Sequence, residues 1–450
     1  MGFENIEKRS LAYNALYHYV KFWYNKVFYR KVIILNYNKV PENEPLIFTP
    51  NHQNALMDAL AMLFSVKNQL VFMARSDIFK KFAPILYFLK ILPIYRIRDG
   101  IDTLKKNQAV FDKTVDVLNA YNGLVILPEG NHKDERRLRP LKKGFARIAF
   151  QTVLEGDLNK DIKIVPVGID YDDYTHCRSR QLINFGDPIP VSQFLKDYKE
   201  NPAIGLNKIK DHLAERMKPL MINIESVEYY EFINEMRVLY RSEMCQKMSL
   251  NPKDEADGFF ADQKFIEIMS DAIETSPDTV AGMDAGFKKL VNLLKKFKLH
   301  PKDIQSKPSL FAILAKTFLL ILTFPLFVYG YLNHLLAFQI PYTLTQKVKD
   351  EMFRTSFMFV LTLVFFPLFY LIQTLVVLFI FHSWEIALLY FITLPVFAII
   401  SWKWKNLFLN IRNNLRKFKL FKTDKWNVAT QIFEELLLSI RNLTDNKMTS

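Results

Sequence analysis

The chain has 450 residues, half of them hydrophobic, and phenylalanine is unusually frequent at 39 residues. This length accommodates two or three domains, and the hydrophobic content indicates that part of the chain lies in lipid. The formal net charge of +14 is spread over many lysine-containing stretches, which favours an anionic membrane surface or a phosphorylated substrate over nucleic acid. The two cysteines exclude a disulfide framework and a cysteine zinc site.

Aromatic and basic residues interleave between Leu11 and Val32. This composition is typical of a helix in the membrane interface, with its rings at the depth of the lipid headgroups. An ordinary amphipathic helix packed on a neighbouring domain fits the pattern equally well. We take residues 1–39 as an N-terminal amphipathic segment. Because Met1–Asn14 has no apolar core typical of a signal peptide, we expect this region to stay in the cytoplasm.

Residues 40–190 alternate short apolar runs with helical segments, which is the pattern of an α/β domain. The predicted strands are 46–48, 70–73, 92–95, 124–127, 162–169 and 182–185, and the predicted helices are 55–66, 78–89, 101–120 and 143–154. We expect a mixed sheet flanked by helices, with polar residues in the turns that follow the strands.

His52 lies in the turn between the first predicted strand and the helix after it, near an N-terminus that Asn51 or Asn54 can cap. Histidine titrates near neutral pH, so a histidine in such a turn is a candidate general base. Asp58 is placed to bond one ring nitrogen, fix the tautomer and stabilise the imidazolium. Most histidine and aspartate pairs at this spacing are surface or capping residues, so the pair alone does not establish catalysis.

Basic residues follow two of the later strands. Arg96 comes directly after the run 92–95, and the segment after 124–127 carries Arg136, Arg137, Arg139, Lys142 and Lys143. Arginine offers a planar fork that matches phosphate oxygens, so we expect a phosphate pocket at this edge of the sheet. Arg96 is the stronger candidate, since a solvated loop is the better interpretation for two of the three later arginines.

Four motif blocks in one order resemble the glycerolipid acyltransferase family, which includes glycerol-3-phosphate, dihydroxyacetone-phosphate and lysophosphatidate acyltransferases. The blocks are His52 with Asp58, Pro93-Ile94-Tyr95-Arg96, Pro128-Glu129-Gly130 and Val165-Pro166-Val167-Gly168. Five residues separate His52 from Asp58, where the family most often has four, and Asn131-His132 stands where Thr-Arg is commonest. Both departures resemble the fungal-type glycerol-3-phosphate acyltransferase branch and its bacterial relatives.

This resemblance implies a direct acyl transfer. His52 would remove a proton from a glycerol hydroxyl, which attacks the thioester carbonyl of acyl-CoA or acyl carrier protein, with Asp58 as the partner of His52. The residues assigned to acceptor binding are Asn51, Arg96, Glu129, Gly130, Arg139 and Lys143. The resemblance implies no metal, bound cofactor or acyl-enzyme, in keeping with a sequence that has no Gly-x-Ser-x-Gly elbow.

Beyond residue 190 the sequence becomes helical and then lipid-like. Residues 191–306 are polar, with candidate helices at 206–223, 227–248, 261–274 and 280–298. We expect this region either to pack on the catalytic domain or to recruit the acyl carrier. Residues 307–402 form a membrane region in which Phe357–Phe381 and Ile386–Ile400 predict a helical hairpin. Residues 310–340 fit one tilted helix or a broken, re-entrant pair. Residues 403–450 form a basic amphipathic segment for the anionic leaflet.

These features predict a membrane-bound O-acyltransferase of phospholipid biosynthesis, with glycerol 3-phosphate or 1-acylglycerol 3-phosphate as its acceptor. We expect a multi-pass protein of the cell (inner) membrane whose catalytic domain faces the cytoplasm. Both flanks of the membrane region are basic, which places them inside and requires an even number of crossings. The alternative is a non-catalytic membrane adaptor or lipid-binding protein that retains the acyltransferase fold.

Overall fold

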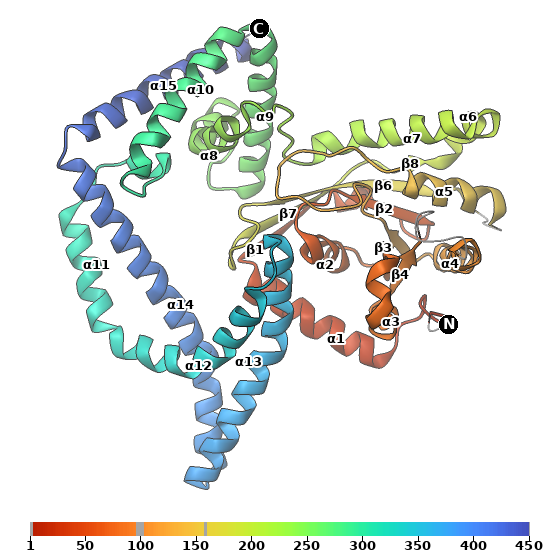
Figure 1. Ribbon diagram of the computed structural model, residues 1–450, viewed down its shortest axis with the longest axis horizontal. Helices are drawn as coiled ribbons and strands as arrows, with labels where there is room; N and C mark the ends of the chain where they lie inside the picture. The colour runs from red at the N-terminus through yellow and green to blue at the C-terminus, as the bar shows by residue number, and fades with distance from the viewer. Residues whose placement is uncertain (1–2, 96–102, 157–159, 450) are drawn as a thin grey trace. The chain divides into compact units, whose positions relative to one another are not determined.

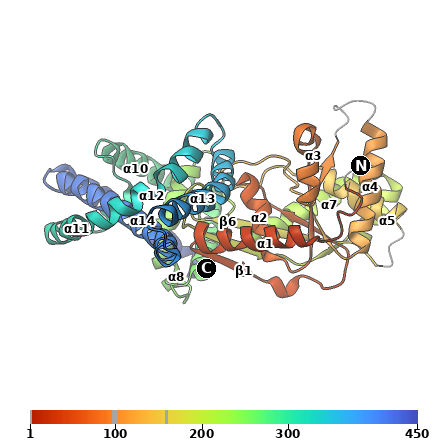
Figure 2. The ribbon, with the colours of Figure 1, turned by 90° about the horizontal axis from the view of Figure 1, so that it is seen from below.

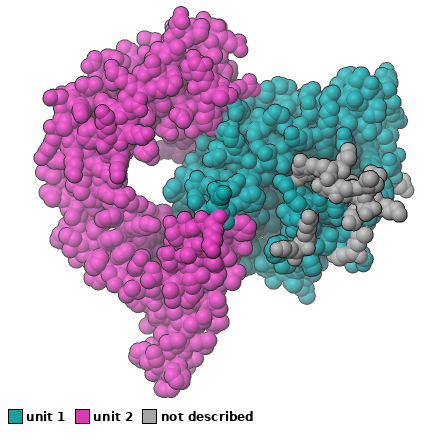
Figure 3. Space-filling model, in the orientation of Figure 1, with its two compact units in different colours: residues 1–223, 348–356 teal, residues 224–347, 357–450 magenta. Residues whose placement is uncertain are grey.

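The structure is a computed structural model that describes residues 3–95, 103–156 and 160–449 (Figure 1). The chain forms two compact units (Figure 3). The first unit consists of Met1–Asn223 and the short piece Val348–Ser356, and the second consists of Ile224–Lys347 and Phe357–Ser450. The first unit is therefore assembled from two pieces that are far apart in the sequence.

A mixed sheet of eight strands lies at the centre of the first unit (Figure 1). The strands are β1 (Lys31–Leu35), β2 (Leu46–Pro50), β3 (Leu70–Arg75), β4 (Ile91–Ile94), β5 (Gly123–Val125), β6 (Lys163–Tyr171), β7 (Arg180–Phe185) and β8 (Ile189–Pro190). Their order is β1-β7-β6-β2-β5-β3-β4, and β8 pairs with β6. The strands from β6 to β4 are parallel, whereas β7 is antiparallel to β6. Because parallel strands end at the same edge, the loops after β2, β5 and β6 meet there.

Helices cover both faces of this sheet, as predicted. The helices of the first unit are α1 (Leu11–Phe22), α2 (Ala55–Ser65), α3 (Phe79–Phe88), α4 (Thr103–Asn119), α5 (Gly144–Glu155), α6 (Leu195–Glu200) and α7 (Pro202–Met217). Alternate strand residues such as Ile47 and Leu124 share one core cluster with Phe145 of α5 and Leu213 of α7. Helix α2 lies on the opposite face of the sheet (Figure 1). Every residue of β2 is buried, as expected for a strand that is covered on both sides.

The N-terminal segment differs from the prediction. Helix α1 ends at Phe22 and a π-helical turn follows, after which β1 joins the sheet beside β7. The β-branched run Val32-Ile33-Ile34 favours this strand, so the fold of the catalytic domain begins before residue 40. Helix α1 lies beside α2 (Figure 2), and the rings of Tyr17 and Phe64 are 5.5 Å apart between centroids. Phe22 is 59% exposed, and its contact with a membrane stays a prediction.

The second unit is helical throughout its described residues. Its helices are α8 (Tyr230–Lys247), α9 (Glu255–Thr275), α10 (Pro277–Lys295), α11 (Leu310–Leu322), α12 (Phe324–Thr345), most of α13 (Glu351–Phe381), α14 (Trp384–Phe421) and α15 (Lys425–Thr449). Helix α15, predicted as part of a membrane-surface segment, packs against α10. Its residues Ala429, Phe433, Leu436 and Ile440 recur every three or four positions and are buried.

Among the described residues, two helices, α13 and α14, are long and apolar enough to cross a membrane, and they correspond to the predicted hairpin. Helices α11 and α12 meet at a bend of 58°, so residues 310–340 form a broken pair and not a single tilted helix. Side-chain hydrogen bonds join α12 to α13. The His334 ring lies 2.7 Å from the Tyr370 hydroxyl, and Gln373 donates to the backbone oxygen of Asn333 at 2.7 Å. Such bonds hold apolar helices together in lipid.

Candidate active site

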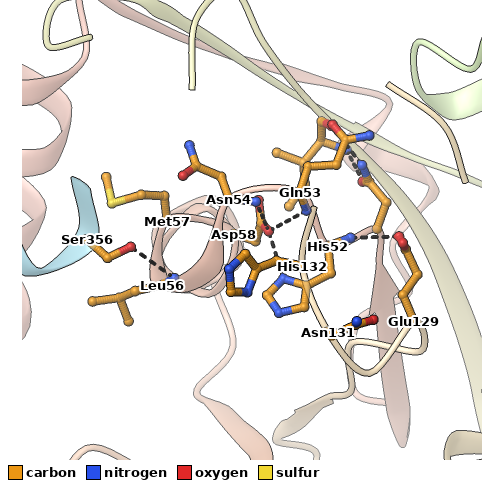
Figure 4. A network of polar contacts seen from close by, with 12 residues as sticks. His52, Gln53, Asn54, Leu56, Met57, Asp58, Glu129, Asn131, His132 and Ser356 are labelled. Atoms are coloured by element: carbon orange, nitrogen blue, oxygen red, sulfur yellow. Dashed lines mark hydrogen bonds and ion pairs between the residues drawn. The ribbon is translucent and has the colours of Figure 1, made fainter. Parts of the chain in front are cut away.

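The predicted base and its partner are in contact. His52 follows β2 by two residues, and its Nδ1 lies 2.9 Å from Oδ2 of Asp58 in the first turn of α2 (Figure 4). Asp58 is fully buried, whereas 13% of the His52 side chain is exposed. A carboxylate at Nδ1 holds the proton on that nitrogen and leaves Nε2 as the proton acceptor. The pair therefore has the geometry of a general base with an orienting carboxylate.

Asp58 is held by several donors at once. Its Oδ2 accepts from the backbone N–H groups of Gln53 at 2.8 Å and Asn54 at 2.7 Å, and its Oδ1 accepts from the Tyr171 hydroxyl at 2.6 Å. Burial, together with the nearby charge of Asp58, raises the pKa of Tyr171 well above its usual value, so this phenol stays a donor. These bonds compensate a buried carboxylate and fix its orientation.

The turn into α2 differs from the expected capping. Asn54 is the N-cap residue, but its side chain makes no capping hydrogen bond, and Asp58 bonds the loop N–H groups instead. Ala55 has a φ of 44°, a left-handed conformation that an L-residue rarely adopts. Asn51 is buried, and its amide bonds both the N–H and the oxygen of Ile169 on β6. Asn51 therefore links two strands, and its contact with a substrate stays a prediction.

A second buried carboxylate holds the backbone of His52. Glu129, in the loop after β5, accepts from the His52 N–H at 2.8 Å and from Arg139 Nε at 2.6 Å. Arg139 also donates to the backbone oxygen of His52 at 3.0 Å. Burial raises the pKa of Glu129, while the charge of Arg139 opposes that rise. Gly130 supplies the turn at a φ of 76°, which glycine adopts without strain.

The other predicted acceptor contacts are placed differently. Arg96 lies outside the described residues. Lys143 immediately precedes α5, and its side chain makes no hydrogen bond or ion pair with any residue in the described part of the chain. The structure thus brings together His52, Asp58, Glu129, Gly130 and Arg139, and substrate contacts by any of the six assigned residues stay predictions. Within the described ranges, no group of three or more potential metal ligands is gathered.

Two side chains that were not among the predicted site residues lie close to His52 and Asp58. Tyr171 lies at the end of β6, the strand beside β2, and only the order of the strands reveals that it reaches Asp58. The ring of His132 lies 5.4 Å from that of His52, measured between centroids (Figure 4). A histidine near the third motif block was visible in the sequence, but its partners were not.

Comparison with known proteins places this domain in a family. Residues 31–170 match the family model described as Acyltransferase. Glycerol-3-phosphate O-acyltransferases 1 and 2 of Saccharomyces cerevisiae are 28% identical over 144 residues and 27% identical over 148 residues. These matches cover 31% and 33% of this chain and 19% of each yeast protein.

Among solved structures, the chain is similar to the crystal structure of the 1-acyl-sn-glycerophosphate (LPA) acyltransferase PlsC from Thermotoga maritima. The TM-score is 0.32 at 16% identity, covering 46% of this chain and 80% of that one. The region matched by the family model carries His52 and Glu129 in the loops after β2 and β5, and Asp58 in α2. Residues 31–170 are therefore similar to an acyltransferase domain, and the two yeast proteins that they match are named glycerol-3-phosphate O-acyltransferases.

Proposed function

We propose that the protein is a membrane-bound O-acyltransferase that moves a fatty acyl chain from acyl-CoA or acyl carrier protein to a glycerol-3-phosphate-type acceptor. The observation that carries this proposal is the His52–Asp58 pair, because a buried carboxylate orients an imidazole that reaches the surface. The names of the yeast relatives support glycerol 3-phosphate as the acceptor. The alternative acceptor is 1-acylglycerol 3-phosphate.

The chemistry follows from Nε2 of His52, the ring nitrogen that does not contact Asp58. Nε2 takes the proton of the acceptor hydroxyl while the hydroxyl oxygen forms a bond to the thioester carbonyl carbon. The tetrahedral intermediate collapses by breaking its carbon–sulfur bond, and the imidazolium returns its proton to the leaving thiolate. Asp58 stabilises the imidazolium between these two steps. The products are an ester and a free thiol, and no acyl-enzyme is required.

Membrane attachment and a cytoplasmic catalytic domain are part of the proposal. Helices α13 and α14 support membrane spanning by their length and composition. The piece Val348–Ser356 belongs to the catalytic unit, so the link between α12 and α13 lies on the same side of the membrane as the active site. This arrangement supports a broken pair α11–α12 that enters the bilayer and returns. Because acyl-CoA and acyl carrier protein are cytosolic donors, that side is the cytoplasm.

An acyl-transfer assay with the purified full chain tests the proposal. The protein in detergent receives labelled acyl-CoA or acyl carrier protein with glycerol 3-phosphate, dihydroxyacetone phosphate or 1-acylglycerol 3-phosphate, and the lipid product is identified. His52→Ala should lower kcat by about 10²–10⁴-fold, as expected for the loss of a general base, and Asp58→Asn should also impair turnover. The unfolding temperature of His52→Ala should stay near that of the wild type.

His176→Gln is a suitable control, since His176 also pairs with an aspartate, Asp173, but its side chain is 80% exposed. This variant should retain wild-type turnover. Turnover of a folded His52→Ala protein at the wild-type rate would end the assignment of His52. A folded wild-type protein that acylates none of the acceptors would instead favour the membrane adaptor.

A further inference from the structure

A segment from the C-terminal half of the chain lies at the active site. Val348–Ser356 comprises the end of the link between α12 and α13 and the first residues of α13, and it belongs to the first unit. The hydroxyl of Ser356 accepts from the backbone N–H of Leu56 at 3.3 Å (Figure 4). Leu56 lies in the first turn of α2, two residues before Asp58. The segment therefore contacts the helix that carries the partner of the base.

Two residues of this segment hold His132. Oδ2 of Asp350 lies 2.9 Å from Nε2 of His132, and the Phe353 ring stands nearly perpendicular to the imidazole at 4.6 Å between centroids. Oδ1 of Asp350 accepts from the Phe353 N–H at 3.0 Å, so the same carboxylate caps α13. Burial alone would raise the pKa of Asp350, but the Phe353 N–H and the His132 ring outweigh it and lower that pKa. Asp350 is thus a charged partner for His132.

His132 and His52 form two neighbouring imidazoles, each with its own carboxylate. Their planes meet at 69°, and the His132 side chain is 10% exposed. Asp350 occupies Nε2, and within the described ranges Nδ1 of His132 has no hydrogen-bond partner. An imidazole donates at both nitrogens only as an imidazolium, and Asp350 supplies the counter-charge for that form. His132 therefore presents an open ring nitrogen beside the base, and Asp350 supplies the counter-charge when both ring nitrogens donate.

We propose that Val348–Ser356 completes the acceptor site, with Asp350 and Phe353 as positioning residues for His132. Nδ1 of His132 then binds the phosphate of the acceptor while His52 deprotonates its hydroxyl. This inference rests on the proposed function. The two rings lie 5.4 Å apart between centroids, so one small acceptor can contact both. Arg139 is less suited to this contact, because its guanidinium already bonds Glu129, Asn131 and the backbone of His52.

Steady-state kinetics of the full chain in detergent test the proposal. His132→Gln should raise the KM for glycerol 3-phosphate about 10- to 100-fold, as expected for the loss of one charge-assisted hydrogen bond, and leave the KM for the acyl donor unchanged. Asp350→Ser keeps an N-cap residue for α13 but removes the oxygen that reaches His132, so the acceptor KM should rise in the same way. The double variant with His132→Gln and Asp350→Ser should have the same acceptor KM as His132→Gln alone.

The matched controls are His176→Gln, from an exposed histidine–aspartate pair, and Asp254→Ser, which replaces the N-cap of α9. Both should leave the acceptor KM unchanged. A rise in KM that is equal for acceptor and donor, additive effects in the double variant, or an unchanged acceptor KM in both single variants would overturn the proposal.

The inference and the proposed function fail in different ways. If the wild-type protein shows no acyl transfer, calorimetric titration with glycerol 3-phosphate still tests the site, because His132→Gln should weaken binding about 10- to 100-fold. Equal binding by the wild type and the variant would overturn it. If His132→Gln does not fold, Asp350→Ser and Phe353→Leu are titrated in its place, with weaker binding expected and unchanged binding contradicting the proposal.

Discussion

Two buried carboxylates hold His52 in different ways. Asp58 bonds the ring, whereas Glu129 bonds the backbone N–H, and both side chains are fully buried. Asp58 is compensated by uncharged donors in addition to the His52 ring, and Glu129 by one cation, Arg139. A buried charge that loses its compensation costs several kcal/mol. The position of the base therefore depends on residues that take no proton themselves.

Removing Arg139 should destabilise the protein in a way that depends on pH. Arg139→Met leaves Glu129 buried without its cation, which costs about 3–5 kcal/mol of the free energy of unfolding. Without Arg139 the folded-state pKa of Glu129 rises further above its unfolded value. A raised pKa of Glu129 means that stability is fully present below the unfolded-state pKa and is lost as the pH rises through the folded-state pKa. The loss in the free energy of unfolding of Arg139→Met should therefore be smaller at pH 5 than at pH 8. Denaturant unfolding at both pH values measures this.

Arg137→Met is the control for this measurement. Arg137 pairs with Glu135, and about a quarter of each side chain is exposed. Such a pair contributes about 0–1 kcal/mol, so the control should lose little stability at either pH. A deficit of Arg139→Met that is independent of pH would show that Glu129 is not the group left uncompensated.

At the scale of the helices, one glycine allows a close approach in the membrane region. A Cβ on Gly330 of α12 would overlap the backbone oxygen of Phe397 in α14. Small residues at such positions let membrane helices pack closely, since the hydrophobic effect does not drive their association in lipid. Gly282 of α10 is a useful comparison, because a Cβ there meets no atom within 4 Å.

Substituting these two glycines should have opposite effects. Gly330→Ala should separate α12 from α14 and lower the unfolding temperature in detergent. Gly282→Ala should raise stability by about 0.5–1 kcal/mol, since alanine loses less backbone entropy in a helix. Thermal unfolding of both variants in the same detergent measures the difference. Equal shifts would contradict the close packing of α12 on α14.

The elements between residues 46 and 190 could be predicted because their signals are local. Apolar periodicity places those strands and helices within a few residues, and the contact of His52 with Asp58 spans a single turn. Strand β1 was missed because its short run follows an aromatic helix, and its pairing with β7 is a tertiary contact. Asp350 lies 218 residues from His132, so no local pattern predicts that contact.

For the whole molecule, the proposed topology predicts where single cysteines are labelled. Cys177 is exposed and would be replaced by serine first, whereas Cys245 is buried. A cysteine at Ser383, between α13 and α14, should react with an impermeant reagent from outside the cell. A cysteine at Ser450 should react only after permeabilisation, because the proposed topology places both ends of the membrane region inside. External labelling at Ser450 would overturn this arrangement.

The first unit, which carries the candidate active site, consists of two pieces of chain that are synthesised at different times. Met1–Asn223 leaves the ribosome well before Val348–Ser356, by on the order of ten seconds at the usual rate of translation. Helices α11 and α12 emerge in that interval, so in the proposed topology they reach the bilayer before Asp350 can meet His132. In the proposed site, His132 is therefore positioned to bind the acceptor phosphate only after the nascent chain has inserted into the membrane. The acceptor site would then be completed at the membrane, where the lipid product has to be released.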